Sequence, residues 1–192
     1  MLLALLLAIY NSDSAPATVA ASNGWTIAYS PGMPSRMPMR DGHYYFDFPN
    51  ANGVHYVYKK APSVSVGQTV TMVFTIEGGG NFVPTEGAAS ARVRLFMQER
   101  GDTLTAAEQY KRWWSTAFVE LKPGTFTLTA IVAPELWSSV FGKNGSRVPG
   151  EFKNAISDLA NIGFTFGGTF AGHGVYVTSG SVRFILKEFN IT

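Results

Sequence analysis

Six side chains in this sequence are of types that could bind a ligand by stacking and by hydrogen bonding. Three are aromatic rings, which can stack on the flat apolar face of a ring-shaped molecule. Three are charged groups, which can exchange hydrogen bonds with hydroxyl groups and so select among such molecules. The six candidate ligand-binding residues are Tyr45, Tyr56, Arg92, Arg94, Trp114 and Glu120. No residue is assigned a catalytic role from the sequence.

An alternation of apolar and polar residues predicts that these side chains stand on β-strands. Tyr44, Phe46 and Phe48 share one parity, and His43 and Asp47 have the other. Successive side chains of a strand point to opposite faces, so such runs mark strands with one buried face. The runs are Trp25–Tyr29, Gly42–Phe48, Val54–Lys59, Thr69–Glu77, Ala91–Gln98, Trp113–Leu121, Thr125–Ala133, Ile162–Phe166, Val175–Thr178 and Ser181–Ile191. We therefore expect an all-β protein, a two-sheet antiparallel β-sandwich (jelly roll); an up-and-down barrel is the alternative.

A few short helical turns are expected between the strands. One begins at Thr105, which fits a capping box with Glu108. Another begins at Pro134, with Trp137, Val140 and Phe141 facing inward. A third covers residues 152–159, where apolar side chains recur at helical spacing.

The two faces of the sheets are expected to differ in character. Three aromatic pairs are expected to divide between the core and an outer face: Tyr44/Tyr45, Tyr56/Tyr58 and Trp113/Trp114. Arg92 and Arg94 share a face with Phe96, opposite Val93. An outer face that mixes aromatic rings with arginine and glutamate is typical of a ligand groove. The alternative is that both sheets bury aromatic rings and the charged groups are merely solvated.

Composition narrows the class of partner. Only 15% of the residues are charged and the net charge is +2, against a usual charged fraction of about 25%. Because no cluster of Lys and Arg stands out, we expect no nucleic-acid partner. A weakly charged, aromatic surface suits neutral polar partners better. The chain has no cysteine, which excludes disulfides and thiol nucleophiles.

Metal binding has little support in the residue spacing. His43, His55 and His173 lack the spacing of a ligand motif, so no metal site is expected. A structural calcium ion is the one cofactor considered. Its plausible oxygen donors are Asp47, Asn50, Asn52, Glu188 and Asn190.

Residues 1–21 are expected to be an export signal and residues 22–192 a single β-sandwich domain. Leu2–Tyr10 is an apolar run too short to span a bilayer as a helix. Ala15–Ala17 fits the small-x-small pattern of signal cleavage, and Ala20 and Ala21 belong to a second candidate. A buried first strand is the alternative. Since a bacterial exported protein needs no cysteine, we expect a secreted, periplasmic or cell-surface location, with no membrane span in the mature chain.

Several segments carry a resemblance to a known class of domain. They are Val54–Tyr58, Gly67–Val70, Leu121–Gly124, Phe126–Leu128, Gly172–Tyr176 and Ser181–Phe184. Their strand and turn pattern resembles that of jelly-roll carbohydrate-binding modules with a galactose-binding-like architecture. The resemblance implies non-catalytic binding of a carbohydrate or polysaccharide partner. The second hypothesis is a small polysaccharide lyase or hydrolase, in which Arg92 or Arg94 would neutralise a uronate and His55 or a tyrosine would act as base. The third is a structural or adhesion domain of a surface or virion assembly.

Overall fold

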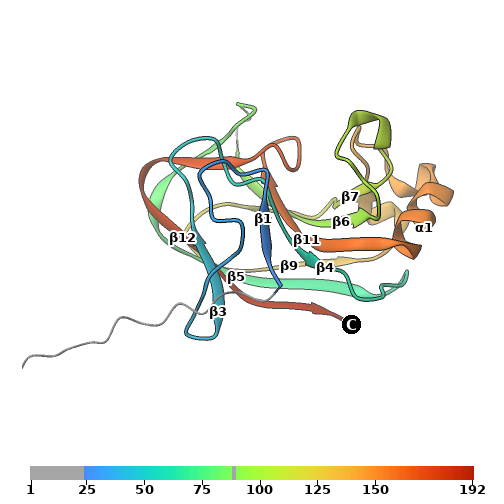
Figure 1. The fold of residues 1–192 in the computed structure, drawn as a ribbon, viewed down its shortest axis with the longest axis horizontal. Helices are drawn as coiled ribbons and strands as arrows, with labels where there is room; N and C mark the ends of the chain where they lie inside the picture. The colour runs from blue at the N-terminus through green and yellow to red at the C-terminus, as the bar shows by residue number, and fades with distance from the viewer. Residues whose placement is uncertain (1–23, 88–89) are drawn as a thin grey trace, which may run out of the picture.

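Two antiparallel β-sheets pack face to face in the computed structural model, which describes residues 24–87 and 90–192 (Figure 1). The first sheet has the strand order β1-β4-β11-β6-β7-β10, with β8 also beside β6. Its strands are β1 (Thr26–Ala28), β4 (Tyr56–Lys60), β6 (Arg92–Glu99), β7 (Arg112–Ser115), β8 (Val119–Glu120), β10 (Trp137–Ser138) and β11 (Leu159–Gly167). The predicted all-β sandwich is therefore confirmed, and the barrel alternative is not.

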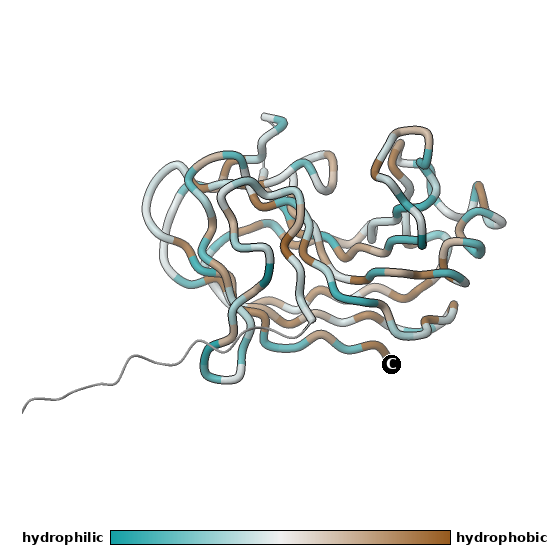
Figure 2. Tube along the Cα trace, in the orientation of Figure 1, coloured by the Kyte–Doolittle hydropathy of each residue, from teal (hydrophilic) through white to brown (hydrophobic). Residues whose placement is uncertain are grey.

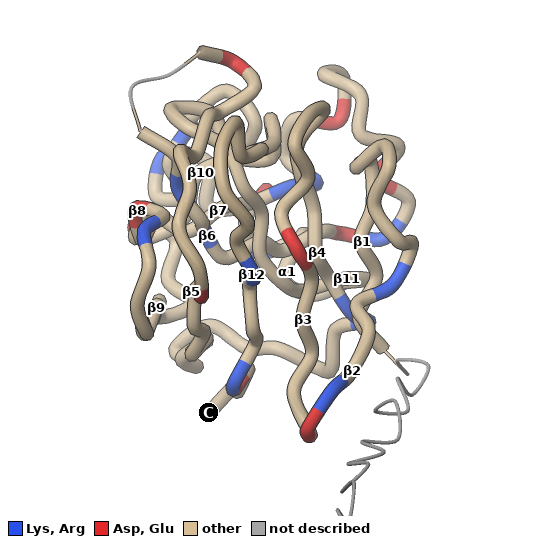
Figure 3. The backbone as a smooth tube through the Cα atoms, turned by 90° about the vertical axis from the view of Figure 1, so that its left-hand side faces the viewer, with Lys and Arg blue, Asp and Glu red and all other residues tan. Residues whose placement is uncertain are grey.

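The second sheet has the order β2-β3-β12-β5-β9. Its strands are β2 (Met39–Arg40), β3 (His43–Asp47), β5 (Thr69–Pro84), β9 (Gly124–Ile131) and β12 (Val175–Ile191). Figure 3 shows one side of the molecule, on which acidic and basic residues are interspersed. The two sheets differ in strand order and in strand length.

The core lies between the two sheets and follows the predicted alternation. In β6, Val93, Leu95 and Met97 are fully buried between the sheets, whereas Arg92 and Arg94 lie on the other face. Figure 2 shows this alternation along the strands as brown segments between white and teal ones. Because one parity is sealed in the core, the other parity of β6 is left to form an outer surface.

Stacked phenylalanines fill the middle of the core. Phe184 of β12 stacks on Phe46 of β3 and on Phe74 of β5, with ring centroids 5.1 Å apart in each pair. Phe164 of β11 stacks on Phe184 from the facing sheet, also at 5.1 Å. Aromatic pairs at this separation add stabilisation beyond the burial of their area, so this cluster locks the two sheets together.

Two of the three aromatic pairs divide between core and outer face as expected, Tyr44/Tyr45 and Trp113/Trp114. The prediction is wrong for Tyr56 and Tyr58. They are two residues apart on β4 and share the outer face, while Val57 between them is fully buried in the core.

The paired strands β5 and β12 are longer than the sequence suggested. They run together from Val175 opposite Pro84 to Ile191 opposite Val70, with two register shifts. The prediction ended the first strand at Glu77 and split the second at residues 179–180. The glycines at 78–80 and 180 instead lie within the pair, where the two strands bend. The backbones approach closely at this point, since a side chain on Gly180 would collide with the backbone of Gly79.

The helical segments are short, as expected, but all three differ in detail. The helix expected over residues 152–159 ends at Ser157, and Leu159 begins β11. Helix α1 (Pro149–Ser157) buries Phe152 and Ile156, and the turn η3 (Gly145–Arg147) precedes it. The turn η2 (Pro134–Leu136) ends before Trp137, which belongs to β10. At η1 (Ala106–Glu108) Thr105 makes no side-chain cap; Glu108 instead accepts a hydrogen bond from the Thr103 N–H.

The predicted strand over residues 113–121 is two strands, β7 and β8, both paired with β6. Between them the Ser115 hydroxyl accepts a hydrogen bond from the Leu95 N–H (3.0 Å) and donates to the Ala117 carbonyl (2.7 Å). A side chain therefore replaces a backbone partner at the break. The predicted export signal, residues 1–21, lies outside the described residues. Among residues 24–87 and 90–192, none of the helices combines the length and apolar character needed to cross a bilayer.

Candidate functional site

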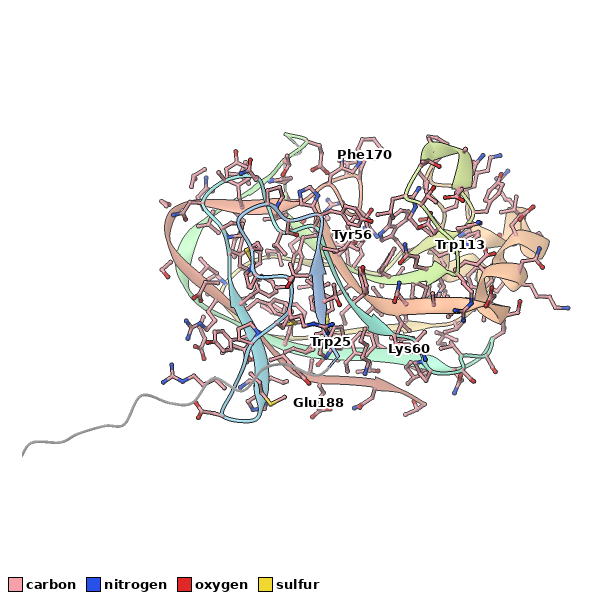
Figure 4. The ribbon with its side chains drawn as sticks, in the orientation of Figure 1. Trp25, Tyr56, Lys60, Trp113, Phe170 and Glu188 are labelled. Carbon is pink, nitrogen blue, oxygen red and sulfur yellow. The ribbon has the colours of Figure 1, made fainter. Side chains whose placement is uncertain are left out.

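A groove of about 780 Å³ lies over the outer face of the first sheet. Its floor is formed by β4, β6 and β7, through Tyr56, Arg94, Arg112 and Trp114. Its walls are loop residues within 104–106, 138–144 and 169–173. Figure 4 shows Tyr56 below the wall loop that carries Phe170. The volume is within the range of about 300–1,000 Å³ that is usual for small-ligand sites.

An aromatic row forms the middle of the floor. Phe96 of β6 is fully buried although it lies on the outer face, because Tyr56 and Trp114 cover it. Its ring centroid is 5.1 Å from that of Tyr56 and 5.9 Å from that of Trp114. Gly163 of β11 is paired with both Tyr58 and Phe96. A side chain on Gly163 would collide with the β4 backbone, so its absence lets the strands approach closely under the row.

Buried polar atoms of the site lack partners. The Trp114 indole N–H and the Ser139 hydroxyl are buried and line the groove, and neither has a hydrogen-bond partner among the residues the structure describes. The hydroxyl of Thr165 also lacks a partner; Thr165 does not line the groove but is paired with both Tyr56 and Arg94 across the sheet. An unpaired buried polar group costs about 1–3 kcal/mol, so a hydrogen-bonding partner at these atoms would stabilise the protein.

Two exposed rings stand in the walls. Phe141 is 63% exposed and Phe170 is 58% exposed, and both line the groove. Neither ring is among the six candidate binding residues. The expectation that Phe141 faces inward is wrong, because η2 ends at Leu136 and the helical spacing does not extend to residue 141. Their only sequence signal is a phenylalanine flanked by glycine, serine and threonine in a segment that predicts no core strand.

Contacts of Glu86 and His55 with backbone groups hold the wall that carries Phe170 in place. The Glu86 carboxylate accepts hydrogen bonds from the N–H groups of Gly168 (2.7 Å) and Phe170 (3.2 Å). The His55 ring nitrogens lie 3.0 Å from the Gly172 carbonyl oxygen and 2.9 Å from that of Asn52. Both sides of this imidazole are thus occupied by backbone, so His55 holds the wall in place.

The opposite wall is organised by a buried ion pair. Asp102 Oδ2 lies 3.4 Å from Arg112 Nε, with 0% and 5% of the two side chains exposed. Asp102 also accepts hydrogen bonds from Gln98 Nε2 (2.9 Å) and the Leu104 N–H (3.0 Å). Arg112 donates in turn to the Thr105 carbonyl (2.7 Å). Leu104 has a φ of 62°, a conformation that costs a non-glycine residue energy and that these contacts hold.

Burial also raises the pKa of one tyrosine in the floor of the groove. It raises the pKa of the Tyr56 hydroxyl to about 12, and the Arg112 charge offsets part of that rise. Tyr56 is therefore a neutral hydrogen-bonding group at ordinary pH.

The structure brings together three of the six candidate binding residues, Tyr56, Arg94 and Trp114, in the groove. Arg92 and Glu120 lie beside it as an ion pair, with Nη2 and Oε1 3.8 Å apart.

Tyr45 is on the outer face of the second sheet, where the Arg183 guanidinium lies 4.7 Å from its ring centroid. Its environment is a smaller pocket of about 310 Å³ that also includes Arg40 and Lys187. The parity of Tyr45 was predicted correctly, but parity does not tell which sheet a strand joins.

Within the described residues, no three His, Asp or Glu side chains come together in a way that could hold a metal ion. Of the considered calcium donors, Asp47 is bound by Arg183, and Asn190 donates to Glu188. A structural calcium ion stays a prediction.

No protein-family model matches the sequence, and no curated protein matches it either. Two solved structures are similar to the chain over most of its length. One is a "xylan-binding module CBM15", 18% identical with a TM-score of 0.43, covering 88% of this chain and 95% of that one. The other is described as "Prominent members of the human gut microbiota express endo-acting O-glycanases to initiate mucin breakdown", 10% identical with a TM-score of 0.42, covering 91% and 95%. Both likenesses concern the β-sandwich fold.

Proposed function

We propose that this protein is an exported, non-catalytic carbohydrate-binding β-sandwich that holds a glycan in the groove. The observation that carries the proposal is the composition of that groove. Its floor is a row of aromatic rings, its buried donors lack partners, and exposed rings stand in its walls.

A sugar ring matches these features chemically. Its two faces are apolar, with C–H groups that pack on aromatic rings, and its edge carries hydroxyl groups. Phe141 and Phe170 would contact the faces of a sugar from the walls. The Trp114 indole N–H in the floor and the Ser139 hydroxyl in a wall would bind hydroxyl groups. Each contact replaces water with a matched partner, which is how a neutral molecule is bound with selectivity.

The groove favours binding over the lyase or hydrolase hypothesis. A glycosidase uses two carboxyl groups about 5–10 Å apart, and no described Asp or Glu lines the groove. The nearby Asp102 is sealed and paired with Arg112. A base works best with a pKa near the operating pH, whereas Tyr56 has a pKa of about 12 and His55 faces two carbonyl groups.

The test is retention of the protein on glycans, measured by affinity electrophoresis on a panel of polysaccharides. We expect Phe141→Ala and Phe170→Ala each to weaken binding about 2- to 10-fold, the range of one aromatic contact. Ile131→Ala is the matched control, since Ile131 is 45% exposed on the second sheet. Trp114→Phe keeps an aromatic ring over Phe96 but removes the indole N–H together with part of the ring, so it should weaken binding and, because Trp114 is buried, also lower the melting temperature.

Two results would reject this function. If every variant is retained as strongly as the wild type on each bound glycan, the groove is not the site. If no glycan on the panel is retained, and light scattering shows a large oligomer, the structural or adhesion hypothesis takes its place.

A further inference from the structure

We propose that the groove selects glycans whose sugars carry a carboxylate, and that Arg94 binds that carboxylate; this rests on the proposed function. The inference comes from the hydrogen bonds that Arg94 makes and from those it leaves unmade. It also reverses the expectation from composition that neutral partners suit this surface best.

One nitrogen of Arg94 is committed to the fold. Nη1 donates to the carbonyl oxygens of Ser115 (2.8 Å) and Thr116 (2.7 Å), where β7 ends. The guanidinium also lies 4.7 Å from the centroid of the Phe118 ring. These contacts fix the plane of the guanidinium. Its Nε and Nη2 edge has no hydrogen-bond partner among the described residues, and the residue lines the groove.

The same edge is used elsewhere in this chain to hold a carboxylate. Arg183 Nε lies 2.7 Å from Asp47 Oδ1, and Arg183 Nη2 lies 2.9 Å from Asp47 Oδ2. This is the two-point pairing in which a planar guanidinium matches a planar carboxylate. Arg94 presents the same pair of nitrogens with no carboxylate opposite them.

The charge of Arg94 is not balanced within the described residues. Arg112 is paired with Asp102 and Arg92 with Glu120, whereas Arg94 forms no ion pair with any described carboxylate. The pKa values reflect this contrast. Burial, and then the charge of Arg92, lower the pKa of Arg94, whereas the hydrogen bond that Arg183 donates to Asp47 raises the pKa of Arg183. A positive group partly removed from water and without a counter-ion favours an anionic ligand.

Matched polymers test the ligand class. Polygalacturonate, alginate and glucuronoxylan are each compared with the carboxyl-reduced form of the same polymer, in which the acid is replaced by an alcohol. We expect at least one acidic form to bind about 10- to 100-fold more tightly than its reduced form, the range for hydrogen bonds to a charged group. Dextran sulfate is the competitor that tests for binding of any polyanion, because its groups carry negative charge without a carboxylate.

Variants at Arg94 test the residue. Arg94→Lys keeps the positive charge and loses the planar edge, so it should bind acidic polymers about 10-fold less tightly. Arg94→Gln should lose at least as much. Binding of the carboxyl-reduced polymers should fall by a much smaller factor than binding of the acidic polymers in both variants, whereas a merely structural effect would weaken both alike. Arg100→Gln is the control of equal charge change, because that side chain is 67% exposed and lies outside the groove.

The outcomes separate this inference from the proposed function. Equal binding of acidic and reduced polymers overturns the inference and keeps carbohydrate binding. Competition by dextran sulfate at the same strength overturns the carboxylate assignment. Loss of binding to acidic and reduced polymers alike in Arg94→Lys assigns Arg94 a structural role. Failure to bind any glycan overturns the proposed function itself.

Discussion

Replacing Asp102 by asparagine tests how much the buried Asp102–Arg112 pair contributes to the stability of the protein. The substitution keeps the size of the side chain and removes its charge. The new amide nitrogen would face Gln98 Nε2 and Arg112 Nε, which are both donors. Since breaking a buried pair leaves an uncompensated charge, the cost is about 3–5 kcal/mol. For a chain of this size about 1 kcal/mol lowers the melting temperature by about 2–4 °C, so we expect a drop of about 6–20 °C.

The matched control is Asp158→Asn. Asp158 pairs with Arg100 at 3.0 Å, a shorter distance than the 3.4 Å of the buried pair, but 53% and 67% of the two side chains are exposed. An exposed pair contributes about 0–1 kcal/mol, so the drop should be less than about 4 °C. Thermal unfolding is followed by circular dichroism at neutral pH and repeated in about 0.5 M NaCl, which should shrink only the control's effect. If both variants melt at the same temperature, burial does not govern the strength of these pairs.

Three further predictions concern single residues of the outer face. The pKa of Tyr56 near 12 exceeds the value of 10.0 for an unperturbed tyrosine, so the unfolded chain loses this proton first. The contribution of Tyr56 to the free energy of unfolding should hold below pH 10 and decline between pH 10 and 12, and denaturant titrations should show that Tyr56→Phe lacks this decline. Gly163→Ala should cost about 1–3 kcal/mol by pressing on the Val57 carbonyl, whereas Gly79→Ala, with open space around it, should melt like the wild type. Tyr29 is 62% exposed, has a φ of 56° and lies 5.8 Å from the Tyr56 ring, but it does not line the groove. Only a glycan that extends beyond the groove would contact it, so Tyr29→Ala should weaken the affinity measured by calorimetry for long glycans but not for short oligosaccharides.

Strand parity explains how much of the site the sequence revealed. Arg94 and Trp114 stand on regular strands, and alternation alone places them opposite Val93 and Trp113. Tyr45 has the correct parity but belongs to the other sheet, because alternation carries no information on which strands become neighbours. The fold class was therefore predictable, and three of the six candidate binding residues line the groove.

The rest of the site depends on contacts that no local pattern encodes. Phe141 and Phe170 are in loops, where the direction of a side chain is set by distant partners. In the case of Phe170 the partner is Glu86, 84 positions away along the chain. The break between β7 and β8 depends on the Ser115 hydroxyl reaching the Leu95 amide, and a serine within an alternating run does not signal such a role.

The groove wall at residues 169–173 runs directly into β12, a strand of the second sheet that bends together with β5. β12 begins at Val175, directly after the wall, and its partner Pro84 lies two residues before the Glu86 that fastens that wall. A glycan that immobilises the wall should therefore slow amide hydrogen exchange around Gly78–Gly80, well away from any sugar. Exchange in β9, farther along the second sheet, should stay the same with and without glycan.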